Sequence, residues 1–179
     1  MTNLELEQFI TEYGREIYSF CVSLCGSRQE ADDLYQDTFL TALEKIDRID
    51  IAGNIRSYLL SVAVRLWKNR RRKRAWRRRI AQEQELNEQT ADRITAEEMQ
   101  DVSVLPEERI LEEERLTAVR RAVSRLPDRL RVPVLLYYME ERQIMEISEI
   151  LRLPEGTVKS RLHQARKRLE RELESVLND

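Results

Sequence analysis

Residues 153–169 read LPEGTVKSRLHQARKRL, a pattern that predicts a helix with one narrow apolar side and a basic remainder. Its apolar residues follow one another at intervals of four, three and four, so they share one face of a helix. These residues are Val158, Leu162, Ala165 and Leu169. Pro154 suits the entrance, because its missing N–H and fixed φ cost nothing at the start of a helix. Taken by itself, this periodicity favours an ordinary amphipathic helix with a solvated cationic face.

The segment before this helix changes that interpretation. Residues 143–151 predict a short helix with its isoleucines turned inward, and residues 152–154 leave room only for a turn. Two helices joined by about three or four residues, the second one basic at its start, form the helix-turn-helix arrangement. We therefore expect this part of the chain to bind DNA.

Charge is strongly segregated along the 179 residues, although the formal net charge is only −2. Residues 65–79 contain ten Lys or Arg and no acidic residue, whereas residues 80–107 contain eight acidic residues against the single base Arg93. Neighbouring blocks of opposite charge indicate segments with different functions or a lack of fixed structure. Residues 80–106 also have weak apolar periodicity, so we expect a linker there with at most transient helix.

The composition favours compact helical bundles over one large core. Hydrophobic residues make up 41% of the chain and aromatic residues only 6%, and no long alternating run of β-branched residues is present. We expect an all-α fold of two small helical domains joined by the acidic linker. The expected helices cover residues 4–24, 30–43 and 55–74 in the first bundle, and residues 110–126, 130–139 and the helix-turn-helix in the second.

Several classes of protein are disfavoured by the residues that are missing. The first residues lack the basic and then apolar pattern of a signal peptide, and no stretch approaches the ~20 apolar residues of a membrane span. A cytoplasmic protein without membrane insertion is therefore expected. Cys21, Cys25 and the single histidine, His163, are too few for a zinc site, so we expect small core thiols and no metal. No nucleophile with a base and no phosphate loop assembles, which argues against an enzyme and against a cofactor.

Two motifs make the order of parts recognisable. Residues 30–39 read EADDLYQDTF, and residues 156–161 read GTVKSR within the segment 145–169. The first motif is similar to region 2.2 and the second to region 4.2 of the extracytoplasmic-function (ECF) sigma factors, a class of the bacterial sigma-70 family. The resemblance covers nearly the whole chain.

This resemblance implies both a domain order and a function. The implied parts are a region 2 domain over residues 1–75, a linker over residues 76–107 and a region 4 domain over residues 108–179. A sigma factor of this class binds core RNA polymerase at its clamp helices and flap, and directs initiation by recognising the minus-35 and minus-10 promoter elements. The implied partners are thus core RNA polymerase, promoter DNA and an anti-sigma factor.

The first motif is the candidate for polymerase docking. Asp33, Gln36 and Asp37 lie at offsets of three and four, so they form one polar, acidic helix face. Such a face suits basic and amide groups on a partner helix, although a solvated acidic stripe has the same pattern. The resemblance implies polymerase docking by Asp33, Gln36, Asp37 and Phe39.

Residues 55–74 resemble regions 2.3 and 2.4, where the family melts the minus-10 element and holds a flipped base. Single strands are gripped by cations along the backbone and by stacking surfaces for the bases. The residues implied in minus-10 binding are Arg56, Arg65, Lys68, Asn69, Arg70, Arg72 and Lys73. Tyr58 and Trp67 are stacking candidates, but helical aromatics are more often core residues. Arg65 stands where the family frequently has Asn, and the loop of residues 47–54 is implied in the choice of the flipped base.

The second motif is the candidate for minus-35 recognition. The residues implied in it are Thr157, Lys159, Ser160, Arg161, His163, Gln164, Arg166 and Lys167. Arg often occupies the place of Gln164 in the family, and Gln prefers an adenine edge where Arg prefers guanine, so a different minus-35 preference is expected. Arg152 stands where a turn glycine is usual in the family, which predicts a strained or rearranged turn costing about 1 kcal/mol.

The alternative is a helix-turn-helix transcription regulator that acts without polymerase docking. It explains residues 145–169, but neither the acidic helix at residues 30–39 nor the basic block at residues 65–79. An arginine-rich RNA-binding protein would explain that block and nothing in the second domain. The sigma-factor interpretation accounts for all three segments.

Overall fold

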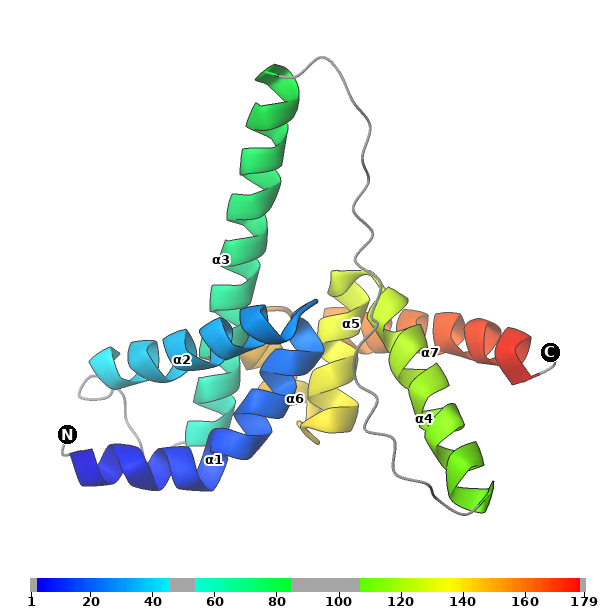
Figure 1. Ribbon diagram of the computed structural model, residues 1–179, viewed down its shortest axis with the longest axis horizontal. Helices are drawn as coiled ribbons and strands as arrows, with labels where there is room; N and C mark the ends of the chain where they lie inside the picture. The colour runs from blue at the N-terminus through cyan, green and yellow to red at the C-terminus, as the bar shows by residue number, and fades with distance from the viewer. Residues whose placement is uncertain (1–2, 46–53, 85–106, 178–179) are drawn as a thin grey trace. The chain divides into compact units, whose positions relative to one another are not determined.

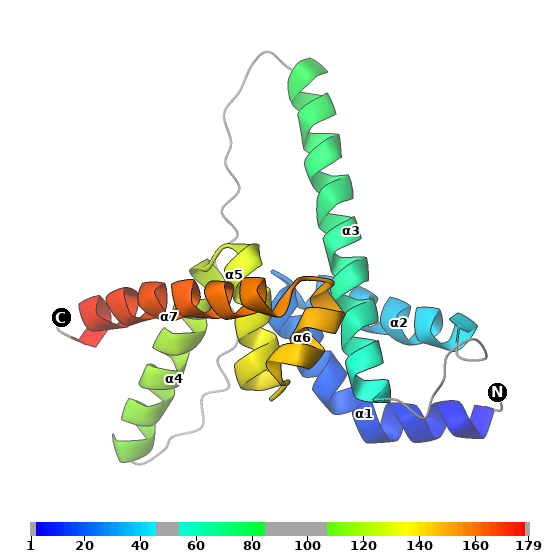
Figure 2. The same cartoon turned by 180° about the vertical axis from the view of Figure 1, so that it is seen from behind.

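The computed structural model describes residues 3–45, 54–84 and 107–177, and every regular element in these ranges is a helix (Figures 1 and 2). Contacts along the chain group it into two compact units, divided between residues 94 and 95. The predicted all-α fold of two helical domains is confirmed. Residues 47–53 of the loop implied in base choice and residues 85–106 of the predicted linker lie outside the described residues.

The first unit contains α1 (Asn3–Leu24), α2 (Arg28–Lys45) and α3 (Ile55–Gln84), and each of the three helices packs against the other two. Polar side chains set where two of them begin. The hydroxyl of Ser27 accepts a hydrogen bond from the Glu30 N–H at 3.3 Å, and the side-chain oxygen of Asn54 accepts one from the Ser57 N–H at 3.1 Å. These caps satisfy N–H groups that have no partner within the helix.

The core of the first unit comes from one face of each helix. Fully or almost fully buried are Ile17, Phe20, Cys21, Leu24, Leu34 and Leu60. Beside them the Tyr35 ring lies between two other aromatic rings, 5.6 Å from that of Tyr18 and 4.9 Å from that of Phe39, measured between centroids. Gly14 leaves room for this cluster, because a Cβ there would lie 2.8 Å from the Tyr35 hydroxyl oxygen.

The helix α3 differs from its prediction at its C-terminal end. It was expected to end at residue 74, yet it runs to Gln84 and extends well beyond α1 and α2 (Figure 1). Residues 55–84 contain neither Gly nor Pro, and Ala, Arg, Gln and Glu are good helix formers, so nothing in the sequence ends the helix at residue 74. The first residues predicted as linker are therefore helical.

The second unit contains α4 (Glu107–Arg125), α5 (Asp128–Val134), a π-helical turn η2 (Leu135–Met139), α6 (Ile144–Leu151) and α7 (Glu155–Leu177). The helix α7 packs against α4, α5 and α6, so it organises the unit. Of the four residues in its predicted apolar stripe, Val158, Leu162 and Ala165 are at most 3% exposed and Leu169 is half-buried.

The segment predicted as one helix over residues 130–139 changes its winding midway. Pro133 lies inside α5 and cannot donate a backbone hydrogen bond. After it, the Glu140 N–H bonds to the Leu135 carbonyl oxygen at 3.1 Å, which is the five-residue step of a π-helix. The change turns Leu135 and Leu136 into the core while leaving Tyr138 exposed.

The turn between α6 and α7 has the strained form that the sequence predicts. Arg152 adopts the left-handed conformation, with φ 54° and ψ 52°. The Leu153 N–H bonds to the Ser148 carbonyl oxygen at 3.0 Å, and the Arg152 N–H to that of Glu149 at 3.3 Å. This is the Schellman motif, in which glycine usually takes the left-handed position.

Candidate functional site

The polar side of α7 forms an open surface opposite its apolar stripe. Its exposed residues among those predicted for minus-35 recognition are Lys159, Ser160, His163, Gln164, Arg166 and Lys167, and half-buried are Thr157 and Arg161. The Gln164 side-chain amide donates to the Ser160 hydroxyl at 3.3 Å, and the Lys159 ammonium lies 3.9 Å from the Glu155 carboxylate. The helix therefore presents cations and hydrogen-bonding groups together, as a helix that enters a major groove does.

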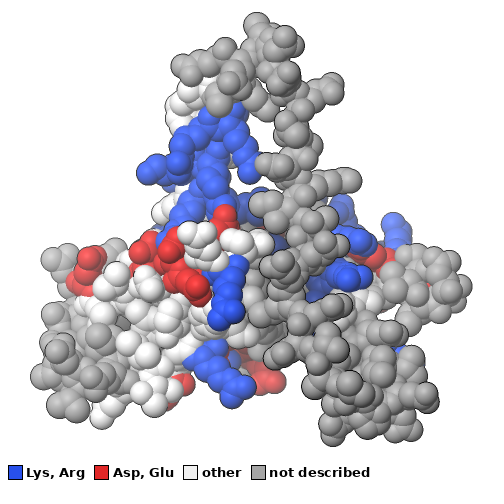
Figure 3. All heavy atoms as spheres, viewed as in Figure 1, with Lys and Arg blue, Asp and Glu red and all other residues white. Residues whose placement is uncertain are grey.

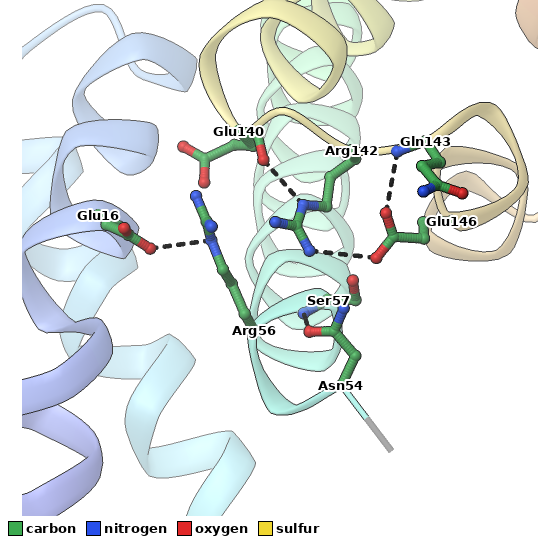
Figure 4. Close-up of polar contacts among 8 residues, drawn as sticks. All are labelled: Glu16, Asn54, Arg56, Ser57, Glu140, Arg142, Gln143 and Glu146. Atoms are coloured by element: carbon green, nitrogen blue, oxygen red, sulfur yellow. Dashed lines mark hydrogen bonds and ion pairs between the residues drawn. The ribbon is translucent and has the colours of Figure 1, made fainter.

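Hydrogen bonds and an ion pair connect the residues just before α6 to its first turn. Glu146 accepts a hydrogen bond from the Gln143 N–H at 2.9 Å, which forms half of a capping box. The same carboxylate pairs with Arg142 at 3.1 Å, and the Arg142 guanidinium also donates to the Glu140 carbonyl oxygen at 2.8 Å (Figure 4). These contacts hold the first turn of α6, which is the first helix of the helix-turn-helix.

Arg166 differs from its neighbours on α7 because it turns back onto the second unit. Its guanidinium donates to the Tyr138 hydroxyl at 2.6 Å and lies 5.8 Å and 5.7 Å from the centroids of the Tyr137 and Tyr138 rings. The hydrogen bond to Tyr138 raises the pKa of the Arg166 guanidinium above its ordinary value. Arg166 thus braces α7 against η2.

A hollow lies where the start of α5 meets the first turns of α7. It is lined by Arg129, Gly156, Thr157, Ser160, Arg161 and Gln164. Four of these are residues predicted to read DNA, and Arg129 is an addition that the sequence pattern did not reveal. Only the packing of α5 on α7 brings Arg129 to them.

The predicted acidic face of α2 lies on the surface, and one of its carboxylates, that of Asp37, pairs with an arginine of α3. Asp33, Gln36 and Asp37 are exposed, as docking requires. The ring of Phe39, the fourth residue implied in docking, lies in the core at 7% exposure and packs on Tyr35. Phe39 therefore supports the acidic face from inside the unit and is not available on its surface.

Two arginines of α3 pair with carboxylates of α2 within the same unit. Arg70 forms an ion pair with Asp37 and also donates to the Asp33 carbonyl oxygen at 3.0 Å. One turn further, Arg74 pairs with Glu30. All four side chains are between 30% and 51% exposed, so water screens these pairs.

The cations of α3 consequently fall into two sets. Arg70 and Arg74 face α2, whereas the other predicted minus-10 residues of the helix body lie on its exposed side. That exposed set is Arg65, Lys68, Asn69, Arg72 and Lys73, and Figure 3 shows Lys and Arg gathered over this helix. At the start of α3, Arg56 instead pairs with Glu16 of α1 at 2.9 Å (Figure 4).

The two aromatic candidates of α3 lie inward. Trp67 is 3% exposed, with the Arg71 guanidinium 5.2 Å from its ring centroid, so it is a core residue. Tyr58 is half-buried, and burial raises the pKa of its hydroxyl while the nearby Arg65 charge lowers it. The chain has a second tryptophan, Trp76, which is 63% exposed on the same helix.

Neither a metal-binding group nor a membrane-spanning helix occurs among the residues that the structure describes. Among those residues no group of three or more His, Cys, Asp and Glu side chains is placed to hold a metal ion. Cys21 is buried in the core of the first unit and Cys25 is half-buried at the end of α1. None of the described helices is both long and apolar enough to cross a bilayer.

Comparison with known proteins matches both units to models of one family. Residues 9–77 match Sigma-70 region 2, and residues 116–169 match Sigma-70, region 4. Among curated proteins, the chain is 31% identical to the ECF RNA polymerase sigma factor SigW of Bacillus subtilis (strain 168), over 92% of this chain and 86% of SigW. It is 27% identical to SigM of the same organism, over 98% of this chain and 99% of SigM.

A solved structure shares the fold. The sigma factor RpoE from Bartonella quintana, in complex with the anti-sigma factor NepR, aligns with a TM-score of 0.72 and 23% identity, covering 95% of this chain and 97% of that one.

Proposed function

The chain belongs to the sigma-70 family as an extracytoplasmic-function sigma factor, and on that premise we propose how its two units share the work of initiation. Proteins of this family bind core RNA polymerase and direct promoter-specific transcription initiation, and they are not enzymes. The observation that carries the proposal is that α3 and α7, in separate units, each present an exposed cationic surface. Two such surfaces suit two separate promoter elements.

We assign residues 1–75 to region 2, residues 76–107 to the linker and residues 108–179 to region 4. In region 2, the exposed Asp33, Gln36 and Asp37 meet basic groups of the polymerase clamp helices, and region 4 meets the flap. The acidic charge of α2 supports this docking, because complementary charge speeds association and fixes register. Since Arg70 pairs with Asp37, a basic partner group competes with Arg70 for that carboxylate.

For the minus-10 element, we propose that the exposed side of α3 carries the contacts, through Arg65, Lys68, Asn69, Arg72 and Lys73. Arg56 and Arg70 take part only after leaving their carboxylate partners. For the minus-35 element, α7 enters the major groove with the residues around the hollow at its start. Thr157, Lys159, Ser160, His163 and Gln164 face base edges, whereas Arg161 and Lys167 contact phosphates.

We further propose that the protein acts in the bacterial cytoplasm, without catalysis of its own, and that an anti-sigma factor controls it. The relative from Bartonella quintana is bound to such a factor. On this chain, Leu116 and Val119 of α4 are 54% and 42% exposed and three residues apart, so both offer apolar surface to a partner on one side of that helix.

Run-off transcription with core RNA polymerase tests the central proposal. Initiation at a promoter only in the presence of the chain supports it, whereas duplex binding without initiation would favour the regulator that acts alone. Asp33→Lys with Asp37→Lys is expected to abolish initiation by preventing polymerase binding. Lys159→Ala is expected to change promoter strength with polymerase binding intact, and equal loss of polymerase binding in both variants would contradict the division of labour.

A further inference from the structure

The last turns of α3 expose a tryptophan among cations. Trp76 is 63% exposed, and Ile80, one turn later, is 40% exposed. Both lie on the part of α3 that extends beyond α1 and α2 (Figures 1 and 2). A tryptophan ring that stays exposed forgoes the burial it usually gains, so its apolar face is available to a ligand.

The direction of Trp76 follows from the ion pairs of its neighbours. Arg70 and Arg74 face α2, and two residues further along a helix correspond to a rotation of about 200°. Trp76 therefore faces away from α2, as do Arg72 and Lys73, which lie four and three residues before it. Arg79 follows three residues after it on the same side.

The exposed side of α3 is thus continuous from Arg65 to Arg79. The side chains along it are Arg65, Asn69, Arg72, Lys73, Trp76 and Arg79, with the Arg72 guanidinium donating to the Asn69 side-chain oxygen at 3.3 Å. No acidic residue occurs in residues 65–79. A cationic track that ends on an aromatic ring fits a single-stranded nucleic acid, whose phosphates need cations and whose bases need a flat apolar surface.

We propose that Trp76 stacks on an unpaired base of promoter DNA while Arg72, Lys73 and Arg79 hold the flanking phosphates. The inference rests on the proposed minus-10 role of α3 and extends that role by about one and a half turns, to the last residues matched to region 2 and beyond. Duplex DNA is disfavoured as the ligand, because its bases are stacked already and offer no free face to the ring.

The two tryptophans of the chain make this site directly observable. A short oligothymidylate added to the full chain is expected to quench the exposed Trp76, and Trp67→Phe should keep the quenching while Trp76→Phe removes it. Inorganic polyphosphate, which carries the charge without bases, should bind without comparable quenching. Equal quenching by polyphosphate would overturn the stacking assignment, and tighter binding of oligouridylate would overturn the assignment to DNA.

Affinity provides the second measurement, from the anisotropy of a fluorescein-labelled oligothymidylate. Trp76→Ala should weaken binding about fivefold or more, and Trp76→Phe should restore most of the loss because it keeps a ring. Leu40→Ala, at a comparably exposed apolar residue of the same unit, is the matched control and should bind as the parent does. Unchanged affinity of Trp76→Ala would refute the inference, whereas failure of the parent chain in run-off transcription would refute only the proposed function.

Discussion

Replacing Arg152 with glycine should stabilise the helix-turn-helix. An L-residue in the left-handed region costs about 1–2 kcal/mol, and Arg152 sits there with φ 54° and ψ 52°. Glycine removes that cost, but it lowers the free energy of unfolding by about 0.5–1 kcal/mol because the unfolded chain gains conformational freedom at a glycine. The net expectation is a gain of about 0.5–1 kcal/mol, because the two hydrogen bonds of the Schellman motif involve only backbone groups and remain.

Amide hydrogen exchange in peptides of α6 and α7 measures this gain within the second unit. Arg152→Gly should slow exchange about two- to fivefold where opening of the unit limits it. Arg152→Ala is the control, since it removes the charge and keeps the Cβ that causes the strain, and it should exchange as the parent does. Equal slowing in both variants would assign the effect to charge and refute the backbone argument.

Three further predictions concern the described contacts. Glu146→Ala removes half of the capping box and the partner of Arg142, so it should destabilise α6 by about 1 kcal/mol in hydrogen exchange, while Glu149→Ala on the same helix should not. Gly14→Ala should lower the thermal stability of the first unit despite a helix-propensity gain of about 1 kcal/mol, because the new Cβ lies 2.8 Å from the Tyr35 hydroxyl oxygen. Adding Tyr35→Phe removes that oxygen and should restore the gain in stability. If the effects of the two substitutions simply add, this clash is ruled out. Burial raises the pKa of the Tyr35 hydroxyl above its ordinary value of 10.0. Below pH 10 the hydroxyl is protonated in the folded and the unfolded protein alike, whereas above pH 10 the unfolded protein loses this proton first. Stability should therefore fall as pH rises above 10, and less steeply in Tyr35→Phe than in the parent when urea unfolding is followed against pH.

The features that could be predicted from sequence are those set by neighbours along the chain. The apolar stripe of α7 follows from intervals of three and four. The strained turn follows from the resemblance, because Arg152 stands where the family usually has glycine. The helix α3 ends at Gln84, ten residues beyond its predicted end at residue 74. A run of arginine, alanine and glutamine without Gly or Pro continues a helix regardless of its charge.

The features that could not be predicted depend on packing between helices. Arg70 and Arg72 look equivalent in the basic block, yet only Arg70 meets Asp37, because α2 lies along one side of α3. Arg129 joins the hollow at the start of α7 only through the contact between α5 and α7. Periodicity gives the faces of a helix but not which neighbour covers each face.

The ion pairs between α2 and α3 affect how the salt dependence of promoter binding should be interpreted. A lysine or arginine that reaches a phosphate normally displaces a condensed counterion from DNA, which sets the slope of affinity against salt. When Arg70 or Arg74 moves to a phosphate, Asp37 or Glu30 loses its cation and attracts one from solution. The net number of ions released is then smaller than the number of contacts made. Counting phosphate contacts from a salt titration would therefore underestimate them for this helix by up to two, unless the partner carboxylates are first replaced by amides.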